Sequence, residues 1–160
     1  MKYIFICFFA LSFTVTAHAQ TLNGMNDAQQ LGSMAGLALA CNAGDKLDDF
    51  QLIASYILGN TYPLESQRQK AFTQFAAEKL RTYNMQKNHP VEDCNTILKR
   101  FYKLPIFEVT IYKDGSVKFP DGKMLRAPTQ KDVKAAQKRA EKKAKEPKRN
   151  YMIPPRHGAS

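Results

Sequence analysis

Apolar residues recur at steps of three and four positions from residue 27 to residue 101, the spacing of helices with one buried face. The first helix is expected to start at Asn26 or Asp27, whose side chains suit an N-cap, and to run to about Cys41. Its apolar positions are Leu31, Met34, Ala35, Ala38 and Cys41. After a turn at 42–45, a second amphipathic helix is expected to end near Gly59. Its apolar positions are Leu47, Phe50, Ile53, Ala54, Ile57 and Leu58.

Two more helices are expected before Pro105. The third begins at Glu65 or Ser66, and its apolar positions are Ala71, Phe72, Phe75, Ala76, the stem of Lys79, Leu80 and Tyr83. We expect a polar break at 84–88 and then Pro90 as the first residue of a fourth helix. The apolar positions of that helix are Val91, Cys94, Ile97, Leu98 and Phe101. On the first helix, Gly32 and Gly36 predict a close contact between helices; the same spacing is a dimer motif in membranes, but this segment is too short to span one.

The apolar period changes to two after Pro105. Residues 107–112 alternate as in a half-buried strand, residues 113–116 form a turn, and residues 117–119 return. A second turn at 120–122 allows a short third strand at Met124–Leu125. A hairpin alone is marginally stable in water, so we expect it to lie against the helices or to offer its edge to a partner.

The last segment is rich in lysine and alanine. Thr129 and Asp132 form a helix start related to the capping box, and residues 131–145 carry a single large apolar residue, Val133. Such a segment buries no face, so it is either a solvated helix or a partly helical disordered tail. Residues 151–153 form a small apolar island, either a docking segment or ordinary tail composition.

The first nineteen residues indicate a signal peptide. Lys2 precedes an apolar run at 3–15, and Ala17-His18-Ala19 is a cleavage pattern, so we expect cleavage before Gln20. An uncleaved anchor is the alternative. Cleavage removes Cys7 and leaves two cysteines, Cys41 and Cys94, in an oxidising compartment. Both lie on expected apolar stripes, so we predict a disulfide, worth about 4 kcal/mol in the loop-entropy model; two buried free thiols are the alternative.

These elements predict a mainly α (α+β) protein. Residues 1–19 are the signal peptide, residues 20–104 a disulfide-clamped four-helix domain, residues 105–127 a β-hairpin or short meander, and residues 128–160 a basic tail. The net charge of +10 is unevenly placed: residues 20–125 hold 12 Lys and Arg against 11 Asp and Glu, whereas residues 126–160 hold 11 against 3. The tail therefore carries the basic character.

No pattern of catalytic residues is visible. The histidines lack metal-ligand spacing, and the chain has no phosphate loop and no Gly-x-Ser-x-Gly motif. Acidic residues at 45–49 and 92–93 stand at expected helix starts, where carboxylates suit the helix dipole. We therefore expect a protein that is not an enzyme and that needs no cofactor or metal.

The tail is the candidate partner-binding segment. Its candidate residues are Lys131, Lys134, Lys138, Arg139, Lys142, Lys143, Tyr151, Met152 and Ile153. The expected partners are other envelope proteins, with anionic lipid headgroups or cell-wall polymer as alternatives. We do not expect nucleic acid as a partner, because the chain is exported and its folded part is nearly neutral; a tail that serves only solubility is the remaining alternative.

The layout is similar to that of small periplasmic accessory proteins, including subunits of secretion-system envelope complexes and disulfide-bonded periplasmic chaperones. We expect an exported protein, periplasmic or associated with the outer membrane, that serves as a structural or accessory subunit of a larger cell-envelope assembly such as a secretion system. A periplasmic chaperone or stress protein and a secreted, host-directed factor are the alternatives.

Overall fold

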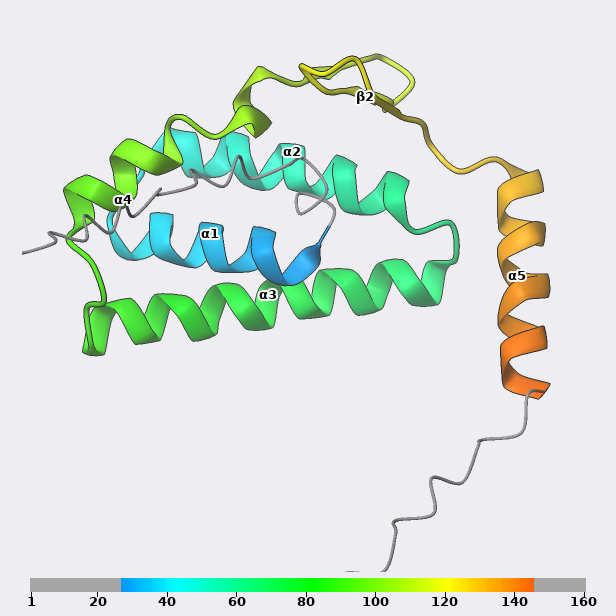
Figure 1. Ribbon diagram of the computed structural model, residues 1–160, viewed down its shortest axis with the longest axis horizontal. Helices are drawn as coiled ribbons and strands as arrows, with labels where there is room; N and C mark the ends of the chain where they lie inside the picture. Colours follow the sequence, from blue (N-terminus) through cyan, green and yellow to red (C-terminus); the bar gives the residue numbers. More distant parts are fainter. Residues whose placement is uncertain (1–26, 146–160) are drawn as a thin grey trace, which may run out of the picture.

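The computed structural model describes residues 27–145, which form five α-helices and a small sheet. The α-helices are α1 (Ala28–Ala40), α2 (Asp45–Thr61), α3 (Glu65–Asn88), α4 (Cys94–Phe101) and α5 (Gln130–Lys145). Between α4 and α5 lie a 3-10 helix, η2 (Pro105–Glu108), and three strands, β1 (Thr110–Ile111), β2 (Val117–Lys118) and β3 (Met124–Leu125). Figure 1 shows α1, α2 and α3 side by side, the sheet beyond α2, and α5 apart from the bundle. The predicted fold class, mainly helical with a small sheet, is confirmed. The expected signal peptide at 1–19 and the island at 151–153 lie outside the described residues.

Two glycines let α1 lie directly against the backbone of α3. A Cβ atom on Gly32 would lie 2.5 Å from the carbonyl oxygen of Phe75, and one on Gly36 would lie 2.4 Å from that of Lys79. The earlier glycine of α1 meets an earlier residue of α3, and the later glycine meets a later residue. The two helices therefore run parallel (Figure 1). The predicted close helix contact is confirmed.

This close contact determines which face of α3 is buried. The expected stripe is wrong in part: Phe72 and Leu80 are 39% and 60% exposed, whereas Thr82 and Gln86 are buried. Thr82 is buried beside Gly36 of α1. Gln86 is buried at the α3–α4 loop, where its side-chain amide donates to the Glu92 carbonyl at 2.6 Å and accepts from the Val91 N–H at 3.2 Å. The Thr82 hydroxyl donates to the Ser33 hydroxyl across the contact at 3.4 Å.

The junction between α3 and α4 differs from the expectation. Residues 84–88 are not a break: they contain no glycine or proline, and α3 continues through them to Asn88, before Pro90. Pro90 is not the first residue of α4, which begins at Cys94 after Asp93. The Asp93 carboxylate accepts hydrogen bonds from the Thr96 backbone N–H at 3.0 Å and the Thr96 hydroxyl at 2.6 Å, and this N-cap sets the start.

The predicted disulfide is confirmed, although one of its cysteines is not where the apolar pattern placed it. Cys41 and Cys94 are joined with a Cα–Cα distance of 5.2 Å, 53 positions apart in sequence. Cys41 is 7% exposed, but Cys94 is exposed rather than buried. Cys94 lies in the first turn of α4, and that helix buries Ile97 and Phe101 instead. The bond ties the end of α1 to the start of α4.

An aromatic cluster closes the core on the side of α4. The Phe101 ring lies 5.2 Å from that of Phe50 and 5.3 Å from that of Phe107, measured between centroids. Phe107 makes this contact from η2, so the expected strand over 107–112 is shorter than predicted and is confined to Thr110–Ile111. Pro105 starts the 3-10 turn that carries the ring inward.

The sheet is an antiparallel meander in the order β1-β2-β3, so the short third strand is confirmed. Gly115 and Gly122 have φ of 79° and 85°, as the two turns require. The Asn60 amide, on α2, donates to the backbone carbonyl of Gly115 at 2.8 Å and to that of Leu125 at 3.5 Å. With Val117 also buried, the hairpin lies against the helices.

Candidate partner-binding surface

The basic segment forms a helix with a defined start. At the N-terminus of α5 the Asp132 carboxylate accepts hydrogen bonds from the Thr129 backbone N–H at 2.9 Å and from its hydroxyl at 2.6 Å. The Asp132 N–H lies 3.3 Å from the Thr129 hydroxyl oxygen, which completes the box that the sequence predicts. The hydrogen bonds from the Thr129 hydroxyl and N–H lower the pKa of Asp132, so the carboxylate is charged at the positive end of the helix dipole.

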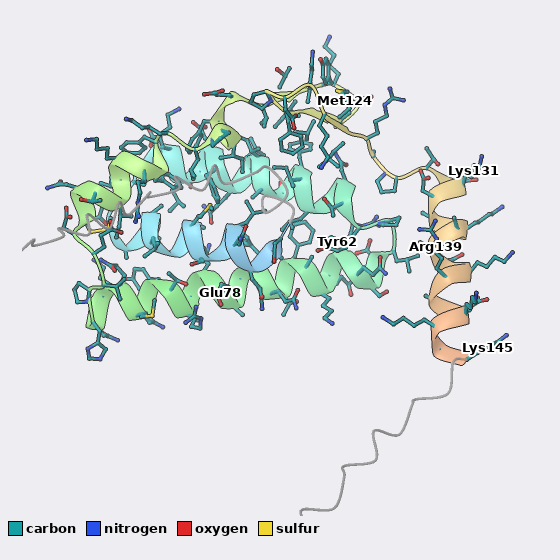
Figure 2. The ribbon with its side chains drawn as sticks, viewed as in Figure 1. Tyr62, Glu78, Met124, Lys131, Arg139 and Lys145 are labelled. Atoms are coloured by element: carbon teal, nitrogen blue, oxygen red, sulfur yellow. A yellow bond between two sulfur atoms is a disulfide. The ribbon has the colours of Figure 1, made fainter. Side chains whose placement is uncertain are left out.

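Helical periodicity divides α5 into two faces. One face carries small residues: Val133, Ala136, Ala140 and Ala144. The other face and its border carry seven cations: Lys131, Lys134, Lys138, Arg139, Lys142, Lys143 and Lys145. None of the residues of α5 is buried. Figure 2 shows these side chains extending from a helix that lies apart from the bundle.

The cations of α5 are free of internal pairing. The ion pairs among residues 27–145 join Lys46 to Asp49, Arg68 to Glu65, Arg81 to Glu78 and Arg100 to Glu92. None of these pairs involves α5, whose seven cations stand against the carboxylates of Asp132 and Glu141 on the same helix. Like charges repel along such a face, so an anionic surface would lower its electrostatic energy.

The contact between α5 and the bundle is slight. An open cleft lies between them, lined by Pro63 from the α2–α3 turn, by Gln67 from the first turn of α3, and by Ala136, Arg139, Ala140, Lys143 and Ala144 from α5. The side of α5 that faces the bundle is therefore largely its small-residue side, with Arg139 and Lys143 at the edge. The lysines at 131, 134, 138 and 142 remain open to solvent.

The structure brings six of the nine predicted partner-binding residues onto one helix. Lys131, Lys134, Lys138, Arg139, Lys142 and Lys143 all lie on α5, while Tyr151, Met152 and Ile153 lie outside the described residues. Sequence reasoning missed Lys145, which continues the same run. It also missed the exposure of Phe72 and Leu80, because a helical pattern alone does not show which face a neighbouring helix covers.

Several acidic residues in the described part make local hydrogen bonds or lie at helix starts. The hydrogen bonds from Thr96 lower the pKa of Asp93, and the hydrogen bond from Arg81 lowers that of Glu78. Asp45 and Asp48 lie in the first turn of α2. Residues 27–145 contain no group of three or more His, Cys, Asp or Glu side chains arranged to hold a metal ion.

Comparison with known proteins supplies no relative. No helix within residues 27–145 is long and apolar enough to cross a membrane. No known protein family, characterised protein or solved structure matches this chain. The candidate surface is therefore defined by its own chemistry: a solvated helix with small residues on one face and seven cations on the other face and its border.

Proposed function

We propose that this chain is a non-enzymatic, exported accessory subunit of a cell-envelope assembly, and that α5 is the element with which it binds its partner. The disulfide supports the proposed export, because such bonds persist in oxidising compartments outside the reducing cytosol. The disulfide-clamped bundle serves as a rigid support, and the partner is another envelope protein.

The observation that carries the proposal is the unpaired basic face of α5. A 16-residue helix that buries none of its own residues receives little stability from packing on the bundle. Its reciprocal cap at Thr129 and Asp132 nevertheless fixes where it begins. A partner that contacts this helix would supply the stabilisation that the bundle does not.

The chemistry of α5 favours an acidic protein surface over a membrane. Helices that lie in a membrane interface insert large apolar side chains, whereas the apolar residues of α5 are Val133 and four alanines. The lysines at 131, 134, 138 and 142, on the solvent-open side of α5, would instead pair with carboxylates of an acidic protein. Binding should therefore weaken as the salt concentration rises.

The experiment is isolation of the tagged protein from cell envelopes in mild detergent, beside a version that ends at Leu125. The full chain should be recovered with a partner in a fixed molar ratio, and the shortened chain without it. Recovery of the full chain alone would contradict the assembly role. Recovery of the same partner with both chains would contradict the role of α5.

A further inference from the structure

A second surface, separate from α5, lies on the opposite side of the bundle from α1. Its exposed apolar residues are Leu52 on α2 and Phe72, Ala76 and Leu80 on α3; we name it the α2–α3 face. Leu52 is 56% exposed and Leu80 is 60% exposed, values that are high for leucine in a small folded protein. The cleft between α5 and the bundle includes none of these residues.

One hydrogen bond shows that these residues share a face. The Lys79 ammonium on α3 donates to the Gln51 amide oxygen on α2 at 2.7 Å, so the two helices are neighbours at this level. Both helices turn by about 100° per residue, and they run antiparallel in Figure 1. The next residue on each, Leu52 and Leu80, is therefore turned to the same side. Gly32 and Gly36 place α1 on the other side.

Charged residues at one end of the face point to the kind of molecule that covers it. Asp48 lies one turn before Gln51 on α2, and Lys87 lies two turns after Lys79 on α3. Both are exposed, and because the helices are antiparallel both lie at the same end of the face. A two-fold axis parallel to the helices would set α2 of one copy on α3 of another. Each Asp48 would then lie about 7.5 Å along the axis from the Lys87 of the other copy, a gap that the long lysine side chain can span, and Leu52 would meet Ala76 and Leu80.

We propose that the α2–α3 face is the interface of a reversible homodimer with this two-fold arrangement. The face is about 25 Å long, from the 17 residues of α2, and about 20 Å wide across two helices. This gives roughly 500 Å² per copy, less than the about 800 Å² of a standard stable interface. The dimer should therefore be weak and should dissociate on dilution.

Sedimentation velocity of the purified, oxidised protein from about 1 µM to about 0.5 mM tests the dimer. We expect Leu80→Gln to raise the dimer Kd about a hundredfold, since the change acts once in each copy at about tenfold each. The matched control is Val91→Gln, because Val91 is 68% exposed but lies in the loop between α3 and α4. Far-ultraviolet circular dichroism checks that both variants fold.

Charge exchange tests the arrangement within the dimer. Asp48→Lys and Lys87→Glu should each weaken the dimer, and the double variant should restore a Kd within about threefold of the original. Failure of that restoration would overturn the two-fold arrangement. A protein that stays monomeric at about 0.5 mM would overturn the dimer itself. The α2–α3 face would then be covered by something else, such as residues 146–160 of the same chain or another protein.

Discussion

The glycines of α1 give the sharpest test of the packing. In an exposed helix, replacing glycine by alanine raises the free energy of unfolding by about 0.5 to 1 kcal/mol, because it restricts the unfolded chain. At Gly36 the added Cβ would lie 2.4 Å from the carbonyl oxygen of Lys79. A backbone oxygen cannot rotate away as a side chain can, so the two helices must separate.

The magnitude follows from two opposing effects. Ordinary contact begins at 3.4 Å, so α1 and α3 must move apart by about 1 Å, and overpacking of this kind costs about 1–3 kcal/mol. Subtracting the intrinsic gain from the upper end of that range, we expect Gly36→Ala to lower the free energy of unfolding by about 2 kcal/mol. Gly32→Ala should behave alike, with a contact of 2.5 Å to Phe75.

Gly59 on α2 is the matched control. A Cβ atom there would meet nothing within 4 Å, so Gly59→Ala should raise the free energy of unfolding by about 0.5 to 1 kcal/mol. Urea unfolding of the oxidised protein, followed by circular dichroism, measures all three variants. A Gly36→Ala protein as stable as the original would refute the close contact between α1 and α3.

Three further predictions concern the disulfide, the hydrogen bonds that hold the sheet on α2, and the N-terminal cap of α5. Replacing both Cys41 and Cys94 by serine should lower the free energy of unfolding by about 2–5 kcal/mol, measured by urea unfolding; an unchanged midpoint would contradict the clamp. Asn60→Asp would set a carboxylate against the Gly115 and Leu125 carbonyls that the amide now binds. This variant should lower the free energy of unfolding by about 1–3 kcal/mol and speed amide hydrogen exchange in the sheet but not in α1. Exchange rates in the sheet equal to those of the original protein would contradict this role of Asn60. The lowered pKa of Asp132 means that its cap supports α5 above the ordinary value of 3.8 and is lost as the pH falls through the lowered pKa. The helicity of α5, followed by nuclear magnetic resonance, should therefore fall over that acidic range, and Asp132→Asn should remove this part of the pH dependence.

Local signals in the sequence predicted much of the fold. Asp27 caps α1 as expected, accepting from the Gln29 N–H at 2.8 Å, and Thr129 and Asp132 start α5. The glycine turns of the sheet also depend on residues close in the chain. Such features are decided by neighbours in sequence, so a single chain reveals them.

The buried face of α3 could not be predicted in the same way. Phe72 and Leu80 fit the apolar stripe, yet Thr82 is buried instead at the contact with α1, and Gln86 is buried where the α3–α4 loop folds back on α3. Which face of α3 is buried depends on how its backbone packs against Gly32 and Gly36 of α1. This packing is a property of the pair of helices and is not visible in the pattern of α3 alone. Likewise, the seven cations of α5 are visible in sequence, but their freedom from ion pairs depends on where the folded bundle places its carboxylates.

The central claim is that α5 binds the partner through its charge. The most direct measurement compares two triple variants of the tagged protein for recovery of that partner from envelopes. In one, Lys134, Lys138 and Lys142 become glutamine. In the other, Lys70, Lys99 and Lys103, which are exposed on the bundle and its edge, become glutamine, so both proteins lose the same charge. We predict that the α5 variant loses the partner and the bundle variant retains it; equal recovery with both would contradict the claim.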